Sequence, residues 1–326
     1  MSRKLIVVFG ATGHQGSSVV ASFLKNKDYT VRAVTRKPDS EKAKVLAANG
    51  AEVVTADLND YESLVKAFQG ASVAFGVTDF WTLLPIVGLD GAFEGEIQQG
   101  KNLANAAAAT PTLEHYVWST LPSATTASNG KVPVPHIDSK SRVDEYIRSA
   151  LPDLANKTTF FWAGFYATNL ASFLPPVKQE SGKYAWVLPC TPKATAPMMG
   201  LTDANVGVFV GAILAKPEIT LPAKIVLGSV EVLTMGKVLE LWGEVNGVET
   251  VFVQKDPEEY AASFFAGPVF GKELALNMKF FEQDLEGWSK SGEKILTKED
   301  LGIEDAELVS TQQAFERMDW SSIAKA

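Results

Sequence analysis

Short runs of apolar residues alternate with amphipathic stretches through the first half of the chain. The apolar runs predict β-strands at residues 5–9, 31–35, 52–56, 72–77, 115–119 and 158–163. The amphipathic stretches predict helices at residues 17–25, 40–48, 61–68, 94–109 and 139–150. Because the strand runs are apolar almost throughout, we expect helices on both faces of the sheet. This pattern predicts an α/β fold with a Rossmann-type, doubly wound parallel sheet.

After about residue 164 the pattern is less regular, because prolines interrupt short apolar pieces. Residues 207–215 still predict a helix that covers the sheet, and residues 224–228 predict another strand. We therefore expect a Rossmann domain at residues 1–164 that also takes in about 200–228. The rest of 165–326, with an aromatic-rich stretch at 260–288, is expected to form a smaller, interleaved C-terminal α+β lobe.

Composition and charge narrow the class of protein. The chain has 326 residues, 46% of them hydrophobic, with 30 basic and 38 acidic residues and a net charge of −8. These values exclude a disordered chain, a collagen-like repeat and a disulfide scaffold. The single cysteine, Cys190, cannot form an internal disulfide, and the three histidines lack structural-zinc spacing. We expect a protein of the cytoplasm, or of the nucleus if it is a regulator, without a structural metal.

The charge pattern also bears on partners. No run of five or six basic residues occurs, so neither direct nucleic-acid binding nor an anionic membrane surface is expected. Apart from the first strand, the longest apolar stretch is residues 206–215, which is well short of the roughly 20 residues of a membrane span. We expect no membrane association.

A glycine-rich segment follows the first predicted strand and reads Gly10-Ala11-Thr12-Gly13-His14-Gln15-Gly16. Glycine permits a tight turn and a close approach to a pyrophosphate, and the helix that follows offers free N–H groups. Because the segment opens a βαβ series, it predicts a dinucleotide site rather than a ligand-free turn. Its GxxGxxG spacing is typical of short-chain dehydrogenases.

The position that would meet the adenine ribose is basic. About 20 residues after the last glycine, an acidic residue commonly binds the ribose 2′-hydroxyl. Here that position holds Arg36, followed by Lys37. A guanidinium matches a 2′-phosphate, so the pair favours NADP(H) over NAD(H). The alternatives are a solvated basic turn and a ribose contact from Asp39.

Polar residues also end the third and fourth predicted strands, where adenine and nicotinamide-ribose contacts lie in such a sheet. The third strand is followed by Asp57 and Leu58, and the fourth by Thr78 and Asp79. Asp57 serves equally well as a cap for the next helix, so both interpretations stay open.

With these motifs in place, the sequence resembles the NmrA-like family of atypical short-chain dehydrogenases. The matching segments are residues 8–16, 34–36, 50–54, 77–81, 99–103, 136–140 and 164–166, with Asn169. The resemblance implies a Rossmann fold with NADP(H) across the strand ends. It also implies that Phe165, Tyr166 and Asn169 line the nicotinamide side. The family includes fungal nitrogen-metabolite regulators and NADPH-sensing proteins as well as reductases similar to isoflavone reductases.

The usual catalytic motif of short-chain dehydrogenases, Tyr-x-x-x-Lys, is absent, and His136-x-x-x-Lys140 is the nearest match. Lys140 shares a helical stripe with Val143 and Ile147, and the predicted helix places it in a first turn, where the dipole disfavours cations. We therefore expect an anion or hydroxyl partner for Lys140, in ribose binding or catalysis. The alternative is a packed stem with a solvated ammonium group.

Two residues are candidate proton donors, His136 and Tyr166. A neutral imidazole relays protons near neutral pH, although a loop histidine bonded to backbone is an equal alternative. Ser119 and Thr120 end the fifth strand, where the usual catalytic serine lies, or act as caps. An apolar substrate pocket is expected from the following aromatic residues, which are otherwise core: Phe80, Trp81, Trp162, Phe165 and Phe173.

Two functions follow from these residues. The first is an NADPH-dependent reductase that transfers hydride to a small apolar or aromatic carbonyl, enone or imine. The second is a non-catalytic NADP(H)-binding regulator that reports the redox ratio through protein partners. A homodimer is compatible with both. The missing Tyr-x-x-x-Lys motif weakens the enzyme hypothesis, which we nevertheless favour.

Overall fold

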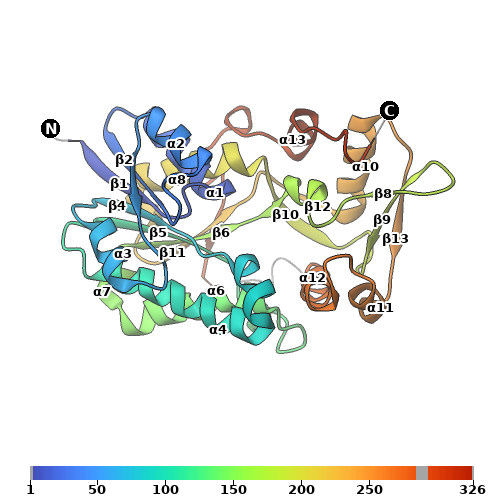
Figure 1. Ribbon diagram of the computed structural model, residues 1–326, viewed down its shortest axis with the longest axis horizontal. Helices are drawn as coiled ribbons and strands as arrows, with labels where there is room; N and C mark the ends of the chain where they lie inside the picture. The colour runs from blue at the N-terminus through green and yellow to red at the C-terminus, as the bar shows by residue number, and fades with distance from the viewer. Residues whose placement is uncertain (1–2, 284–292, 325–326) are drawn as a thin grey trace.

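The computed structural model describes residues 3–283 and 293–324 (Figure 1). Residues 284–288, the end of the predicted aromatic-rich stretch, lie outside this range. Three layers are visible, with helices above and below a central sheet. The predicted α/β fold is confirmed.

The central sheet has eight parallel strands in the described part of the chain. Its order is β14-β11-β6-β5-β4-β1-β2-β3, which contains the 3-2-1-4-5-6 order of dinucleotide-binding folds. The strands are β1 (Lys4–Val8), β2 (Tyr29–Thr35), β3 (Glu52–Thr55), β4 (Val73–Gly76), β5 (His115–Thr120), β6 (Thr158–Ala163), β11 (Lys224–Gly228) and β14 (Ile295–Leu296). All seven predicted strands are present, and β14 is an addition that the pattern does not predict.

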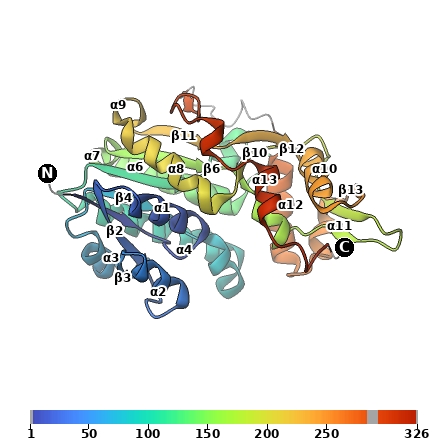
Figure 2. The same cartoon turned by 90° about the horizontal axis from the view of Figure 1, so that it is seen from above.

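Alternating side chains of β1 enter two separate cores, which explains its unbroken apolar run. Ile6 and Val8 face one cluster, and Val7 and Phe9 face the other. The first face is covered by α1 (His14–Leu24), α2 (Glu41–Ala48) and α8 (Thr202–Ala215) (Figure 2). The opposite face is covered by α3 (Tyr61–Phe68), α4 (Phe80–Ala108), α6 (Pro135–Ala150) and α7 (Pro152–Ala155).

Two three-stranded sheets lie beside the central sheet, at the right of Figure 1. One is β12-β10-β7, made of Glu231–Thr234, Thr195–Gly200 and Phe165–Tyr166. The other is β13-β9-β8, made of Thr250–Gln254, Tyr184–Leu188 and Val177–Lys178. The helices around them are α10 (Met235–Asn246), α11 (Pro257–Ala262), α12 (Pro268–Phe280) and α13 (Thr311–Arg317).

Short helices complete the described chain: α5 (Ala124–Ala127), α9 (Pro217–Thr220), and the 3₁₀ turns Ala167–Ala171 and Asp305–Glu307. The chain enters the small sheets after β6, returns to the central sheet for α8 and β11, leaves again, and returns for β14. The proposed domain boundary at residue 164 remains a prediction.

Four helices, α1, α4, α6 and α8, begin earlier than the sequence predicts, and the differences in α4 and α6 affect the candidate site. Helix α4 starts at Phe80, not 94, because Asp79 caps it by accepting the N–H of Trp81. Gly88, with φ +71°, kinks it, which interrupts the helical pattern before residue 94. Helix α6 starts at Pro135, a favoured first position, rather than at 139. Lys140 therefore lies in the second turn, and the expected clash with the helix dipole is wrong.

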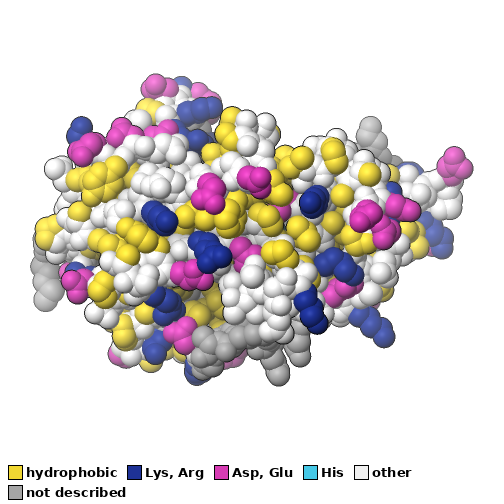
Figure 3. Space-filling model, turned by 90° about the horizontal axis from the view of Figure 1, so that it is seen from below, with side chains coloured by type: hydrophobic (Ala, Val, Ile, Leu, Met, Phe, Trp, Pro, Cys, Tyr) yellow, Lys and Arg dark blue, Asp and Glu magenta, His cyan; other side chains and the backbone are white. Residues whose placement is uncertain are grey.

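The surface carries both charged and apolar side chains. Figure 3 shows acidic and basic side chains interspersed with apolar ones over the face formed largely by α4, α6 and the helices beside them. Among the described residues, no helix combines the length and apolar character that crossing a bilayer demands.

Candidate functional site

A cavity of about 1060 Å³ lies along the carboxyl ends of the central strands. It runs from the start of α2 to α12, and Phe165, Tyr166 and Pro197 of one small sheet also line it. Its lining includes every residue that the sequence predicts for catalysis or cofactor binding, namely Gly10, Thr12, Gly13, His14, Gln15, Gly16, Arg36, Lys37, Asp57, Leu58, Thr78, Asp79, Ser119, His136, Lys140, Phe165, Tyr166 and Asn169. The structure brings these residues together, whereas their individual roles remain predictions.

The three glycines of the loop meet different geometric demands. Gly10 has φ +65°, a conformation that favours glycine. A Cβ on Gly16 would lie 2.2 Å from the carbonyl oxygen of Gly10, so this glycine permits the helix to pack on the loop. Gly13 begins α1 without a side-chain cap, which leaves the first N–H groups of the helix to other acceptors. Such a helix end fits a pyrophosphate.

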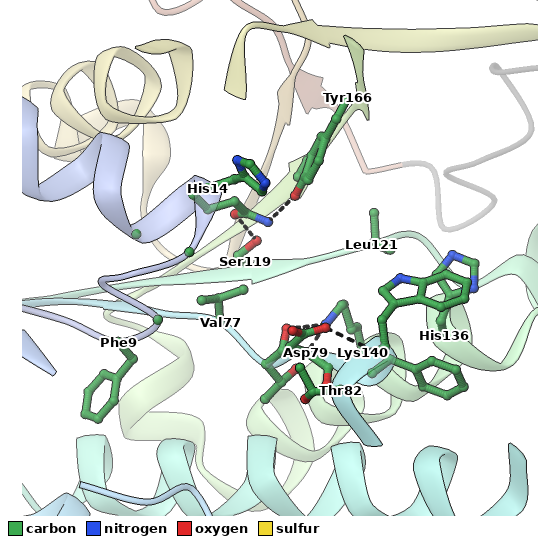
Figure 4. Close-up of a pocket in the computed structure, with 18 of the residues that line it drawn as sticks. Phe9, His14, Val77, Asp79, Thr82, Ser119, Leu121, His136, Lys140 and Tyr166 are labelled. Carbon is green, nitrogen blue, oxygen red and sulfur yellow. Dashed lines mark hydrogen bonds between the residues drawn. The ribbon is translucent and has the colours of Figure 1, made fainter. Parts of the chain in front are cut away.

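The loop is tied to the neighbouring strands through Gln15. Its Oε1 accepts the hydroxyl of Ser119 (2.7 Å), and its Nε2 donates to the Tyr166 oxygen (2.6 Å), as Figure 4 shows. Burial raises the pKa of Tyr166 to about 12. The phenol therefore keeps its proton at neutral pH. His14 is held separately, by a 2.6 Å contact with Asp203 that raises the pKa of the histidine.

Two cations at the end of β2 have no side-chain partner in the part of the chain that the structure describes. The side chains of Arg36 and Lys37 line the cavity and make no hydrogen bond or ion pair within residues 3–283 and 293–324. Lys42, which sequence reasoning missed, lies on the same wall and reaches the Thr12 carbonyl oxygen at 3.4 Å. Arg36, unpaired among the described residues, lines the same cavity as the uncapped start of α1, and a guanidinium is a suitable partner for a phosphate group.

Asp57 does not cap the helix that follows it. The cap of α3 is Asp60, whose carboxylate accepts the N–H of Ser63 at 3.2 Å. Asp57 instead accepts the N–H of Asn59 at 2.8 Å and lines the cavity. The helix-cap interpretation of Asp57 is therefore wrong, and its contact with a cofactor stays a prediction.

Lys140 has an anionic partner, as expected, although the helix dipole is not the reason for it, and the anion comes from α4. Its Nζ donates to Glu96 Oε1 (2.6 Å), Thr78 Oγ1 (3.0 Å) and the Thr78 carbonyl (3.0 Å). Glu96 is fully buried and also accepts the hydroxyls of Thr78 (2.8 Å) and Ser139 (2.5 Å). All three donors of the ammonium group are therefore occupied. A ribose hydroxyl would have to replace one of these partners.

The same network acts on Asp79, the neighbour of Thr78. Burial raises the pKa of this carboxyl, and the negative charge of Glu96 adds to the increase, whereas the positive charge of Lys140 opposes it. Sequence reasoning missed Glu96, because an acidic residue in a helix is commonly on a solvated face.

His136 is a helical residue rather than a loop residue, since it is the second residue of α6. Its backbone N–H donates to Glu273 Oε1 at 2.7 Å, and its Nδ1 lies 2.6 Å from the same oxygen. The alternative of a loop histidine bonded to backbone is therefore wrong. Glu273, on α12, is another residue that sequence reasoning missed.

Aromatic side chains form the end of the cavity near α12. Phe80, Trp81, Phe165 and Phe173 line it as predicted, but Trp162 does not. Trp162 is 5% exposed and packs in the core, since it lies in β6, a strand that is covered on both faces. The sequence alone did not single out further lining residues from α12, which are Leu274, Asn277 and Phe280.

Comparison with known proteins places this arrangement in a family. The NmrA-like family model matches residues 2–312. An NmrA-like family domain-containing protein of Dictyostelium discoideum is 30% identical over 289 residues, which cover 87% of this chain and 88% of the relative. An NmrA-like oxidoreductase of Penicillium ochrochloron is 29% identical over 88% of this chain and 85% of the relative. A match to one from Aspergillus versicolor is 38% identical but covers 46% of this chain and 41% of the relative.

Solved structures with this fold are also similar. NmrA, a negative transcriptional regulator, in complex with NADP superposes with a TM-score of 0.76 at 22% identity, over 99% of this chain and 97% of that one. The triphenylmethane reductase of Citrobacter sp. with NADP(H) gives 0.67 at 21% identity, over 96% and 99%. At these identities the likeness supports the fold alone. The family match over nearly the whole sequence shows that this chain belongs to the NmrA-like family.

Proposed function

We propose that this protein is an NADPH-dependent reductase of a small apolar or aromatic carbonyl, enone or imine. One observation carries the proposal: a single cavity joins the uncapped start of α1 and the unpaired Arg36 to an aromatic end that contains His136. Its volume of about 1060 Å³ is at the upper end of single-ligand pockets. A dinucleotide together with a second, planar molecule suits that size.

The residues present fit NADP(H). The glycine loop and the first turn of α1 would hold the pyrophosphate, and Arg36 with Lys37 would hold the 2′-phosphate. Thr78, Lys140 and Ser119 would face the nicotinamide ribose. Bound NADPH would supply a hydride. The protein would then orient the acceptor against the aromatic wall, exclude water and deliver one proton.

Relatives support both the proposal and its alternative. Several curated relatives are named as oxidoreductases, and the similar triphenylmethane reductase is solved with NADP(H). The similar NmrA is a negative transcriptional regulator that is solved with NAD and with NADP. The satisfied Lys140 and the absent Tyr-x-x-x-Lys motif favour that alternative, a non-catalytic redox sensor with a protein partner.

Turnover distinguishes the two functions. We expect purified protein to oxidise NADPH faster with at least one member of a panel of aromatic ketones, enones and imines than without an acceptor. The measurement is loss of NADPH absorbance, beside titrations of NADPH and NADP⁺. No acceleration with any acceptor, together with an NADP(H)-dependent change in association state or partner binding, would replace the reductase with the regulator.

The cofactor preference depends on Arg36. Arg36→Asp is expected to weaken NADPH binding by roughly 10–150-fold, the equivalent of losing a charge-assisted contact of about 1.5–3 kcal/mol. NADH binding should stay equal or improve, because aspartate accepts from a ribose hydroxyl. Calorimetric titration of both nucleotides measures the change, and Lys37→Ala shows the share of the neighbouring cation. An unchanged NADPH affinity in Arg36→Asp would exclude the assigned phosphate contact.

A further inference from the structure

His136 is held on two sides by one carboxylate. Oε1 of Glu273 accepts the backbone N–H of His136 and lies 2.6 Å from Nδ1 of its ring. The Glu273 side chain is 0% exposed, and its Oε2 has no partner in the described part of the chain. A carboxylate this deeply buried is favourable as an ion beside a cation. A protonated His136 would be such a cation.

The other ring nitrogen of His136 is free to meet a ligand. Nε2 makes no hydrogen bond to residues 3–283 or 293–324, and the ring lines the cavity. The ring of Trp81 packs against it, with centroids 4.9 Å apart. Phe173 and Phe270 pack in turn on Trp81. The imidazole therefore has one fixed orientation, with an aromatic wall beside its free nitrogen.

We propose that His136 is the acid of the reduction and that Glu273 is the residue that positions it. This inference rests on the proposed function and deepens it. As hydride reaches the electrophilic carbon, the C=O or C=N π bond breaks and its electron pair moves to the heteroatom. The Nε2 proton of His136 passes to that heteroatom. The substrate is reduced by two electrons and NADPH is oxidised, while the neutral imidazole keeps its Nδ1 proton on Glu273.

The competing donor, Tyr166, has a less suitable environment. Its oxygen accepts from Gln15, next to the glycine loop, whereas His136 lies farther along the cavity in Figure 4, beyond Leu121. A phenol whose pKa is about 12 is also a weaker acid than an imidazolium. The substrate heteroatom is therefore expected at the α12 end, where Asn277 lines the same wall.

A double-mutant cycle tests the pair. His136→Asn keeps an N–H near the place of Nδ1 but has no acid, and we expect kcat to fall about 10²–10⁴-fold. Glu273→Gln should lower kcat about 10²-fold, with KM for NADPH nearly unchanged. In the His136→Asn background, Glu273→Gln should change kcat less than about threefold, because it acts through the imidazole. Glu244→Gln, an exposed glutamate of α10, is the control for loss of one charge.

A proton-free acceptor gives a second readout. A cationic triarylmethane dye takes hydride at its central carbon and needs no proton, so both variants should slow ketone reduction far more than dye reduction. If the wild type does not reduce the dye, the double-mutant cycle alone tests the roles of His136 and Glu273. Tyr166→Phe is expected to lower kcat for ketone reduction less than His136→Asn does. Should Glu273→Gln not fold, Glu273→Asp replaces it in the cycle.

The possible failures are distinguishable. A wild type without turnover on any acceptor contradicts the proposed function and this inference together. Turnover that survives in His136→Asn contradicts the inference alone. If the loss of kcat in the double variant equals the product of the two single losses, Glu273 does not act through His136. That result would make Glu273 a structural residue and overturn its positioning role.

Discussion

Gly16→Ala is expected to weaken NADP(H) binding by up to about 100-fold and to lower the stability of the fold. The new methyl group would lie 2.2 Å from the Gly10 carbonyl oxygen and 2.8 Å from the Ala11 nitrogen. These are backbone atoms, so the loop must move away from α1. Overpacking of this kind costs roughly 1–3 kcal/mol, which corresponds to about 5–150-fold in affinity. Nucleotide titration and thermal unfolding measure both effects.

Two other glycines serve as matched comparisons. A Cβ on Gly211, in α8, meets no atom within 4 Å, so Gly211→Ala should leave nucleotide binding intact. A Cβ on Gly13 would have its nearest neighbour at 3.4 Å, so Gly13→Ala should keep the fold and lose affinity through crowding of the phosphate. Tight NADPH binding by Gly16→Ala would contradict the proposed role of the loop.

Lys140→Met is expected to cost about 3–5 kcal/mol of stability, because it leaves Glu96 buried without a cation. The double variant Lys140→Met/Glu96→Gln should recover most of that loss, since a neutral amide is cheaper to bury than a carboxylate. Denaturant unfolding of the two variants and the wild type measures the difference. The double variant is then the appropriate protein in which to ask whether turnover needs the ammonium group.

An exposed pair provides the control for this measurement. Arg142 and Glu145 lie on α6 with more than half of each side chain exposed, so Arg142→Met should cost less than about 1 kcal/mol. If Lys140→Met is no more destabilising than Arg142→Met, Lys140 does not compensate a buried charge. In that case the pairing with Glu96 would not explain why lysine occupies this position.

The central sheet was predictable because its strands are buried on both faces. Unbroken apolar runs such as residues 5–9 indicate buried strands directly. The glycine loop indicates a dinucleotide site because it follows the first of these strands. Strand β14, with two residues, is too short to show a pattern. The small sheets contain prolines, for example Pro197 within β10, and were therefore predicted only as an irregular lobe.

The candidate site was also predictable only in part. Residues that follow strands were found, because the carboxyl ends of parallel strands meet at one edge. Glu96 and Glu273 were not found, because an acidic residue within a helix is expected on a solvent-exposed face unless its partner is known. Glu273 is 137 positions away from His136, and only the packing of α12 brings them together. Trp162 is an error of the opposite kind. It was predicted to line the pocket, but it packs in the core, where large aromatic residues are commonly found.

The late arrival of β11 and β14 has a consequence for biosynthesis. Six of the eight central strands are encoded before residue 164, but the strand that pairs with the outer edge of β6 follows about 60 residues later. Until then the nascent chain presents Thr158–Ala163 as an unpaired and strongly apolar edge. A chain that emerges N-terminus first is therefore exposed to aberrant strand pairing during synthesis. Chaperone binding to the ribosome-bound chain would have its greatest value in that interval.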